Sequence, residues 1–397
     1  MEKLKILLVA SGVMTNVLGI LKVHYDLKEA YEKQGHLVDV LDFSVVYPNG
    51  FTTFTKIFGK LYTYKFWQYL KKNAYKYDVI DANYDCIPYP KESFGFKGVL
   101  LVRSHGIKPI YYKAEEIVSY KKALTAERTN IKFKTRLGNI YRRLQKETGL
   151  KEFYASVKYA DLVHCLNSEE YDYYLDYGIP KEKLLLIANG VADKFIQSFN
   201  AEKTTDKKNT LCFIGSWTIR KGIKDFDQIL TQIRKDIDIK NFYLVGGWYP
   251  ESYVKKDFDI SNHDVLRIIP NFEPKDLPNY IRTSKVGLFP SYVEGFSLAV
   301  IEQLACGIPV VAYKVPGPTD ILQGLDETLL IEPGDQKAFA KKVIEILKLD
   351  ETKYNELSER CKQESRKYML STISKEFLEA YTTTLNKKHV AMINQVS

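Results

Sequence analysis

Two carboxylates, Glu294 and Glu302, lie on either side of an expected helix start in the stretch EGFSLAVIEQLACGIPVVA. An apolar strand precedes Glu294, so this carboxylate lies at the carboxyl end of a strand, where it can bind a hydroxyl group of a ligand. Glu302 lies eight residues later, inside the helix, and can accept hydrogen bonds from adjacent hydroxyls such as those of a ribose diol. A capping or salt-bridge role is the structural alternative for Glu302.

The residues around this helix start are suited to binding an anion. Gly295, Phe296 and Ser297 lead into the helix, whose first amide groups have no partner within the helix and whose dipole favours negative charge. Arg220 and Lys221 follow an earlier strand of the same half of the chain and can neutralise the same anion. Together these groups predict a site for a diphosphate.

Short apolar runs alternate with helical patterns along the chain. The runs predict strands at residues 5–10, 37–43, 78–84, 98–104, 161–167 and 184–189, and at residues 210–215, 242–246, 265–270, 285–290, 309–313 and 328–331. Short apolar strands separated by crossovers are typical of parallel, doubly wound sheets. The sequence therefore predicts an α/β protein with two Rossmann-like domains, one for each series of strands.

The limits of these domains follow from a polar stretch in the middle of the chain. We predict a first domain at residues 1–197, a linker at 198–209 and a second domain at 210–372. In open α/β sheets, ligands bind at the carboxyl ends of the strands. Two domains that face each other are therefore expected to form a cleft between their strand ends.

Unusual residues recur at the other predicted strand ends. Ser11–Gly12, His105–Gly106, Asn189–Gly190 and Gly246–Gly247 each follow a predicted strand. A glycine after a strand is usually a turn, and a single histidine is more often structural than catalytic. Their shared position predicts that a histidine, an asparagine, two carboxylates and two cations surround one cleft.

The bulk composition is typical of a globular protein of two domains. The chain has 397 residues, of which 45% are hydrophobic and 27% are charged. Five cysteines are scattered without a CxxC pair, which indicates a reducing compartment. The start of the chain imitates a signal peptide, but Thr15 and Asn16 interrupt its apolar run, and a first strand with a glycine turn explains it better. No apolar run reaches the about 18 residues that span a bilayer, so the sequence predicts a cytoplasmic protein.

Positive charge is concentrated between Ser119 and Lys146. This basic segment holds nine basic residues and one acidic residue, Glu127, so it carries +8 of the net charge of +9. Apolar residues such as Phe133 and Tyr141 interleave with the basic residues at roughly helical spacing. A solvated helical hairpin is one interpretation, and a surface that meets anionic lipid is another. Nucleic acid is a weaker third option, because no recognition motif accompanies the charge.

The stretch around Glu294 and Glu302 resembles the Glu-x7-Glu signature of the retaining, family 4 glycosyltransferases of GT-B fold. Further matches follow in the order of that family: HG at His105, ANGV ending at Val191, then FIGSWTIRKGI and LVGG. The resemblance runs from the first strand to at least Ile331. Its second half is highly specific, and its first half is generic apart from His105 and the Asn-Gly-Val.

This resemblance implies an activity and a division of labour between the domains. It implies retaining transfer of a sugar from a nucleotide-diphosphate donor to a glycan or lipid-linked acceptor, in cell-surface polysaccharide or glycolipid biosynthesis. The first domain would bind the acceptor and the second the nucleotide sugar, and residues 373–397 would form a helix that crosses back to the first domain, plus a tail. No metal or other cofactor is implied, and no Asp-x-Asp motif follows a predicted strand end.

The resemblance also implies roles for individual residues. The catalytic pair would be His105, beside the anomeric carbon, and Glu294, in contact with the transferred sugar. Glu302 would hold the ribose, while Lys221 and the helix-start amides would hold the diphosphate. The full set of implied donor-binding residues is Gly12, Asn189, Arg220, Lys221, Gly295, Phe296, Ser297 and Glu302.

One position departs from the family pattern. The family commonly has arginine after the glycine that ends the first strand of the second domain, whereas this chain has Ser216. Arg220 is a candidate replacement, but its neighbour Lys221 matches the family position, and the two side chains are expected to diverge. Trp217 either packs over the cleft or fills the core. Loss of one bidentate cation costs about 1.5–3 kcal/mol of diphosphate binding unless another group replaces it.

Other classes of protein remain as alternatives. A nicotinamide enzyme would need Gly-x-Gly-x-x-Gly after a strand, and the glycines of VASGVMTNVLG are spaced too widely for it. A phosphorylase or a sugar-nucleotide epimerase can share the two-domain architecture. A catalytically silent nucleotide-sugar-binding or scaffold protein is favoured by Ser216 and disfavoured by the presence of His105, Lys221 and both glutamates.

Overall fold

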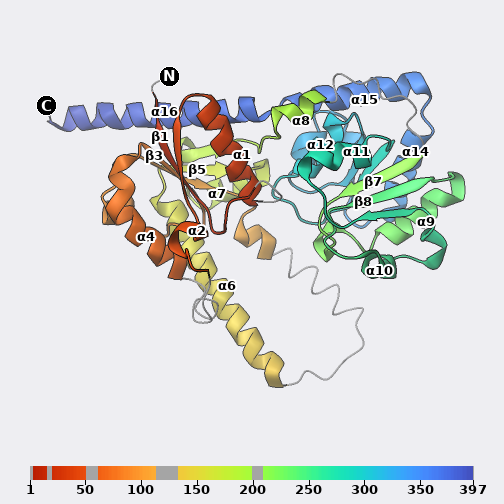
Figure 1. Ribbon diagram of the computed structural model, residues 1–397, viewed down its shortest axis with the longest axis horizontal. Helices are drawn as coiled ribbons and strands as arrows, with labels where there is room; N and C mark the ends of the chain where they lie inside the picture. Colours follow the sequence, from red (N-terminus) through yellow and green to blue (C-terminus); the bar gives the residue numbers. More distant parts are fainter. Residues whose placement is uncertain (1–2, 16–19, 51–60, 113–132, 199–208, 397) are drawn as a thin grey trace. The chain divides into compact units, whose positions relative to one another are not determined.

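The computed structural model describes residues 3–15, 20–50, 61–112, 133–198 and 209–396. Within helices it describes only the backbone of residues 20, 133–142, 198, 392, 395 and 396. The chain divides into two compact units (Figure 1). The first unit is Met1–Ala188 with Ile373–Ser397, and the second unit is Asn189–Thr372. None of the described helices combines the length and the apolar character needed to cross a bilayer.

The first unit is built on a parallel sheet of six strands in the order β2-β1-β3-β4-β5-β6. The strands are β1 (Lys5–Val9), β2 (Leu37–Leu41), β3 (Val79–Asn83), β4 (Val99–Arg103), β5 (Leu162–Cys165) and β6 (Leu184–Leu186). The helices between them are α1 (Ile20–Lys33), α2 (Phe43–Val46), α4 (Leu61–Asn73), α6 (Phe133–Tyr159) and α7 (Ser168–Asp176). Every residue of β1 except Lys5, and all of β3, β4 and β5, is buried, which is why these strands read as largely apolar runs.

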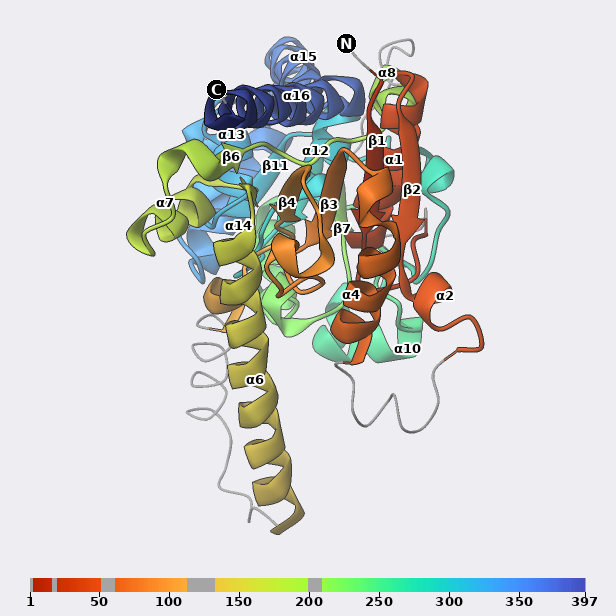
Figure 2. The same ribbon diagram turned by 90° about the vertical axis from the view of Figure 1, so that its left-hand side faces the viewer.

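The two faces of this sheet are covered by different helices. One face carries Leu7, Ile80 and Leu100, which pack with Phe66 and Leu70 of α4. Nearby on β4 and β5, Val102 and Val163 pack with Phe153 and Val157 of α6. The opposite face is covered by α1 and by the C-terminal helix α16 (Leu370–Val396), as the end-on view in Figure 2 shows.

A buried ion pair anchors α16 to the sheet. Asp81 of β3 and Arg103 of β4 are both fully buried, and their carboxylate and guanidinium groups lie 2.5 Å apart. The Tyr381 hydroxyl of α16 donates a 2.7 Å hydrogen bond to Asp81, and the ring of Phe377 lies 4.1 Å from the Arg103 guanidinium. The helix therefore completes the surroundings of two charges that would otherwise face an apolar interior.

The second unit repeats the plan with a parallel sheet in the order β12-β11-β10-β7-β8-β9. The strands are β7 (Thr210–Ile214), β8 (Asn241–Val245), β9 (Leu266–Ile269), β10 (Val286–Phe289), β11 (Val310–Tyr313) and β12 (Leu330–Ile331). The helices are α8 (Asp193–Ser198), α9 (Phe226–Asp236), α10 (Glu251–Val254), α11 (Leu277–Ile281), α12 (Leu298–Ala305), α13 (Pro318–Leu322), α14 (Gln336–Leu347) and α15 (Glu351–Arg366).

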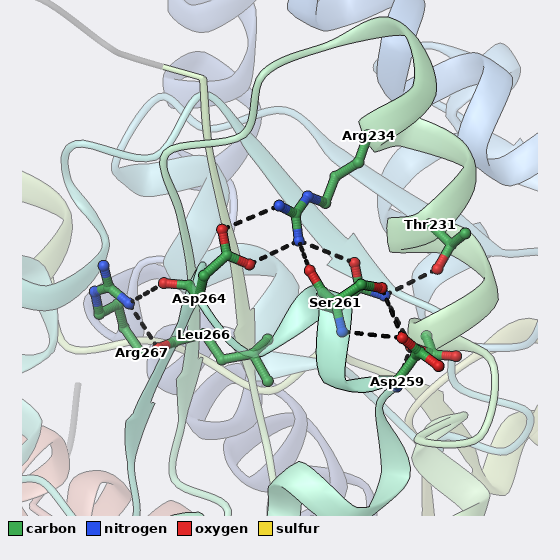
Figure 3. Close-up of polar contacts among 9 residues, drawn as sticks. Thr231, Arg234, Asp259, Ser261, Asp264, Leu266 and Arg267 are labelled. Atoms are coloured by element: carbon green, nitrogen blue, oxygen red, sulfur yellow. Dashed lines mark hydrogen bonds and ion pairs between the residues drawn. The ribbon is translucent and has the colours of Figure 1, made fainter.

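The core of the second unit packs α9 and α14 against one face of its sheet. Residues of α11 contact the other face. Trp217 belongs to this core, because it is 3% exposed and its ring stacks on Phe226 of α9. Figure 3 shows how Arg234 ties α9 to the segment before β9, with its guanidinium paired to both carboxylate oxygens of Asp264 at 2.8 and 3.0 Å. Of the two sequence-based interpretations of Trp217, the structure supports core packing.

The predicted fold class is confirmed, because all twelve expected strands are present in two parallel sheets. Most observed strands are one or two residues shorter than predicted, since the flanking polar and glycine residues belong to the turns. Residues 189–197 were expected in the first domain, but they lie in the second unit, where Val191 pairs with Met369. Residues 199–208 of the expected linker lie outside the described residues. The facing arrangement of the two domains stays a prediction.

Candidate functional site

A sharp turn after β7 carries Arg220 and Lys221. Both belong to a short 3-10 helix, Ile219–Lys221, which ends at Gly222 with a positive φ of 72°. A side chain at Gly222 would collide with the carbonyl oxygen of Pro290, just after β10. Glycine is required here for both reasons. The backbone carbonyl of Arg220 in turn accepts a 2.8 Å hydrogen bond from the amide of Tyr292, so the loops after β7 and β10 are joined.

This junction brings both cations to one carboxylate. The Nζ atom of Lys221 lies 2.5 Å from the Oε1 atom of Glu294, and a guanidinium nitrogen of Arg220 lies 3.4 Å from the same oxygen. Glu294 is only 6% exposed and Lys221 only 8%. The expectation that Arg220 and Lys221 diverge is therefore wrong. Their side chains converge because the 3-10 turn places both beside the Glu294 loop.

Lys221 is held in an environment that weakens its charge. Burial lowers the pKa of Lys221 below its ordinary value, the Glu294 carboxylate opposes this effect, and the neighbouring Arg220 adds to it. The ammonium group also lies 4.8 Å from the centre of the Phe289 ring. A second negative group beside Lys221 would therefore stabilise its protonated form, as a diphosphate would.

The start of α12 contains the buried hydroxyl of Ser297, three residues after Glu294 in the sequence. Ser297 occupies the N-cap position of α12, is 2% exposed and makes no capping hydrogen bond through its side chain. Among the described residues, its Oγ atom has no hydrogen-bond partner. Gly317, with φ of 83°, lets the start of α13 approach Gly295 and Phe296, because a Cβ there would lie 3.1 Å from both. An uncapped helix start with a buried hydroxyl suits an anionic oxygen.

Three further predicted or relevant positions belong to the second unit. Glu302 lies in α12 and is half-buried. Asn189 is 7% exposed, and its Oδ1 atom has no hydrogen-bond partner in the described part of the chain. Ser216 lies half-buried between β7 and the turn that holds Arg220.

His105 lies in the first unit, two residues after β4. Its Nε2 atom is 2.6 Å from the Oδ1 atom of Asn83, at the end of the neighbouring strand β3. Burial, followed by repulsion from His24, Arg103 and His164, lowers the pKa of His105 well below its ordinary value. The imidazole is therefore neutral near pH 7. A neutral imidazole can donate from one nitrogen and accept at the other.

The loop after His105 is fixed by two features. Gly106 has φ of 99°, and a side chain there would collide with the ring of Tyr111. The amide of Ile107 donates a 3.1 Å hydrogen bond to Glu170, a buried carboxylate of α7. Burial raises the pKa of Glu170 to about 7. The predicted turn at Gly106 is thus a position that only glycine fits.

The loop after β1 carries Ser11 and Gly12, as the sequence placed them. The Ser11 hydroxyl donates to the carboxylate of Asp85, with distances of 3.1 and 3.3 Å to its two oxygens. A Cβ at Gly12 would lie 2.9 Å from the Leu21 side chain, which leaves little room for a larger residue. Asp85 follows the end of β3, so it belongs to the same edge of the sheet as His105.

Sequence reasoning missed Asn83 and Glu170. Asn83 ends the apolar run VIDAN, and the rule that selected His105, a polar residue at a strand end, would also have selected it. Glu170 had no such signal, because it lies within a helix. Among the described residues, no cluster of three or more His, Cys, Asp or Glu side chains is placed to hold a metal ion. Independence from metal stays a prediction.

The structure thus gathers Arg220, Lys221 and Glu294 into direct contact. Glu294 is joined through Gly295 and Phe296 to the helix that contains Ser297 and Glu302. His105 and Gly12 lie in the first unit, and Asn189 begins the second. The roles of all these residues in donor binding and catalysis stay predictions.

Residues 194–368 match the family model described as glycosyl transferases group 1. This match covers less than half of the chain. The matched segment, called the group 1 domain below, coincides with most of the second unit and contains Arg220, Lys221, Glu294 and Glu302. Among curated proteins, the N,N'-diacetylbacillosaminyl-diphospho-undecaprenol alpha-1,3-N-acetylgalactosaminyltransferase of Campylobacter jejuni is 23% identical over 237 residues, which is 57% of this chain and 61% of that protein. The chain spans less than two thirds of the length of the curated relatives it matches.

Solved structures of similar fold extend beyond the group 1 domain. The sucrose-phosphate synthase of Thermosynechococcus elongatus is 20% identical, with a TM-score of 0.71, over 97% of this chain and 100% of that chain. Anabaena HepE in complex with UDP-glucose is 14% identical, with a TM-score of 0.63, over 96% of this chain and 100% of that chain. These similarities establish the GT-B fold for this chain.

Proposed function

We propose that this protein is a retaining glycosyltransferase that moves a sugar from a nucleoside-diphosphate donor to a glycan or lipid-linked acceptor. The observation that carries the proposal is the contact of Lys221 and Arg220 with Glu294 beside the start of α12, inside the group 1 domain. Two cations and a helix start suit a diphosphate, and a carboxylate in the same place suits a hydroxyl of the attached sugar. Cell-surface polysaccharide or glycolipid biosynthesis is the setting we propose.

The donor and acceptor classes are supported by the relatives. HepE of Anabaena has been solved with UDP-glucose, and the Campylobacter relative is named for transfer to a diphospho-undecaprenol-linked sugar. We therefore propose a UDP-sugar as the first donor to test and a lipid-linked sugar as the first acceptor.

Each residue has a distinct part in this proposal. Glu302 accepts hydrogen bonds from the ribose, and Lys221, Arg220 and the amides at the start of α12 hold the diphosphate. Glu294 accepts from a hydroxyl of the transferred sugar, and His105 lies beside the anomeric carbon. Arg220 supplies the cation that Ser216 cannot, since its guanidinium already lies at the Glu294 carboxylate.

The direct test is incubation of the protein with a panel of UDP-, GDP- and ADP-sugars, with and without lipid-linked acceptors. Release of nucleotide that depends on an acceptor is expected for one donor. NMR of the product from an α-linked donor should show an α-linkage. A β-linked product would exclude retention, and release of no nucleotide with any acceptor would oppose transferase activity.

A silent nucleotide-sugar-binding protein is the second candidate, and Ser216 is the observation that favours it. In that case the panel would show binding without turnover. Thermal-shift measurements with UDP, GDP, ADP and their sugar conjugates separate this outcome from a failure to bind any donor. An epimerase or phosphorylase would instead convert the donor without a sugar acceptor.

We also propose that the basic segment at residues 119–146 adsorbs to anionic membrane and so brings a lipid-linked acceptor to the protein. Residues 119–132 and the side chains of residues 133–142 lie outside the described residues, so the charge pattern of the sequence is the support. Each basic residue near an anionic surface contributes about 1 kcal/mol, and salt screens this attraction. Sedimentation with anionic vesicles should fall as salt rises and when Lys132, Lys134, Arg142 and Arg143 become serine. Equal recovery with neutral and anionic vesicles would exclude adsorption.

A further inference from the structure

The side chains of Asn83 and His105 meet because two neighbouring strands end at the same edge of the sheet. β3 and β4 run parallel, and Asn83 pairs in register with Arg103. His105 follows Arg103 by two residues, so its side chain returns to the same face as that of Asn83. The resulting contact, between Nε2 of His105 and Oδ1 of Asn83, is 2.6 Å long.

This contact fixes which nitrogen of His105 carries the proton. A carboxamide oxygen only accepts hydrogen bonds, so the Nε2 atom of His105 must be the donor. In the neutral ring the Nδ1 atom then keeps its lone pair. Within the described residues, no hydrogen bond to Nδ1 of His105 is found. The ring therefore has one acceptor site left for a ligand.

The surroundings favour the neutral ring over the charged one. His24 of α1 lies with its ring centre 5.2 Å from that of His105, and Arg103 and His164 repel a positive charge from β4 and β5. Asp81, the charge of opposite sign on β3, is engaged by Arg103 and Tyr381. Asn83 itself is 2% exposed, so water does not compete for its oxygen.

We propose that Asn83 is a positioning residue that holds His105 as the Nε2–H tautomer and directs its Nδ1 atom to accept a hydrogen bond from a hydroxyl of the transferred sugar. The role toward the sugar rests on the proposed function. The tautomer does not, because it follows from the contact inside the first unit. A basic Nδ1 atom would orient a hydroxyl donor, whereas the opposite tautomer would present an N–H to the same hydroxyl.

The first experiment reads the tautomer directly. Long-range proton–nitrogen NMR spectra of the full chain, labelled with nitrogen-15 at histidine, distinguish the two neutral tautomers, and His105→Gln assigns the signals. The wild type and Asn83→Asp should both show His105 protonated at Nε2, since both side chains offer an oxygen there. Asn83→Leu should show a mixture or the opposite tautomer. Asn262→Leu is the control, because Asn262 is an equally buried asparagine of the second unit, where its carboxamide donates to Asp227 and Thr231 and accepts from Arg234.

The second experiment reads the consequence for the reaction. With an active donor and acceptor, Asn83→Leu should lower kcat about tenfold, the scale of one lost hydrogen bond, while the affinity for the free nucleoside diphosphate stays unchanged. Asn83→Asp should retain most activity and shift the acidic limb of the pH profile upward, because a carboxylate beside His105 stabilises its charged form.

The outcomes separate this inference from the proposed function. An unchanged His105 tautomer in folded Asn83→Leu would overturn the positioning role, whatever the activity. A changed tautomer with no transfer from any donor would support the positioning role and count against the proposed function. A changed tautomer in an active enzyme with unaltered kcat would overturn the role toward the sugar.

Discussion

The Nζ atom of Lys221 lies 2.5 Å from the Oε1 atom of Glu294, although the two residues are 73 positions apart in the chain. Both are almost fully buried, and the two loops that carry them are joined by the hydrogen bond between Arg220 and Tyr292. The Glu294 carboxylate is thus the anion that Lys221 and Arg220 contact. A bound diphosphate has to share Lys221 with Glu294 or displace it.

The first prediction concerns the division of labour between the two glutamates. Glu294→Ala should leave the affinity for free UDP unchanged or raise it, because Lys221 and Arg220 lose a competing anion, while sugar transfer falls steeply. Glu302→Gln should weaken UDP binding about tenfold or more, the scale of a hydrogen bond to a charged group. Calorimetric titration with UDP measures both. Equal losses of UDP affinity in the two variants would contradict the assignment.

The second prediction concerns the stability of the buried pair. Lys221→Met keeps the contact with the Phe289 ring but leaves the Glu294 carboxylate with only the more distant Arg220, so we expect a loss of roughly 3 kcal/mol in the free energy of unfolding. Adding Glu294→Gln should recover much of that loss, because the Glu294 carboxylate that had lost the Lys221 ammonium is then replaced by a neutral carboxamide. Urea unfolding of both single variants and the double variant measures this coupling. Additive losses would show that the pair is not coupled.

The third prediction concerns the cation that replaces the missing arginine at Ser216. Arg220→Gln should weaken UDP binding about tenfold, and adding Ser216→Arg should restore it. Arg267→Gln serves as the control, because that arginine bonds to the carbonyls of Asp264 and Leu266 in its own segment (Figure 3). If Arg220→Gln and Arg267→Gln have the same affinity for UDP, Arg220 does not bind the diphosphate.

The fourth prediction is a pH dependence from Glu170. Burial raises the pKa of Glu170 in the folded protein from its ordinary value of 4.5 to about 7, so the folded protein holds a proton that the unfolded chain releases between these values. The contribution of Glu170 to stability is therefore full below about pH 4.5 and is lost as the pH rises to about 7, by roughly 3 kcal/mol. Urea unfolding from pH 5 to 8 should show this decline in the wild type and not in Glu170→Gln. A Glu182→Gln variant, altered at an exposed glutamate, should decline as the wild type does.

Much of the fold could be predicted because buried parallel strands are continuous apolar runs. Runs such as KILLV and VLLVR have no other stable place than the inside of a sheet covered on both faces. The importance of Glu294 was also visible, since a carboxylate before a glycine turn at a strand end has no packing role. Ser297 could be selected as a candidate site residue because it lies at the predicted start of a helix.

The contacts between these residues could not be predicted from the sequence. Lys221 meets Glu294 because β7 and β10 are neighbours, although β8 and β9 lie between them in the chain. Strand order is a property of the whole sheet and leaves no local signal. The convergence of Arg220 and Lys221 depends on the positive φ of Gly222, which a glycine in a sequence permits but does not require.

The division of the first unit into residues 1–188 and 373–397 sets an order of events during synthesis on the ribosome. The whole group 1 domain emerges before the residues of α16 that complete the first unit. Until then Asp81 and Arg103 lack the Tyr381 hydroxyl and the Phe377 ring, and one face of the first sheet lacks one of its two covering helices. The nascent chain therefore carries all residues of the second unit while the first unit is still incomplete. The first unit can therefore close its interior only after the second unit has been synthesised.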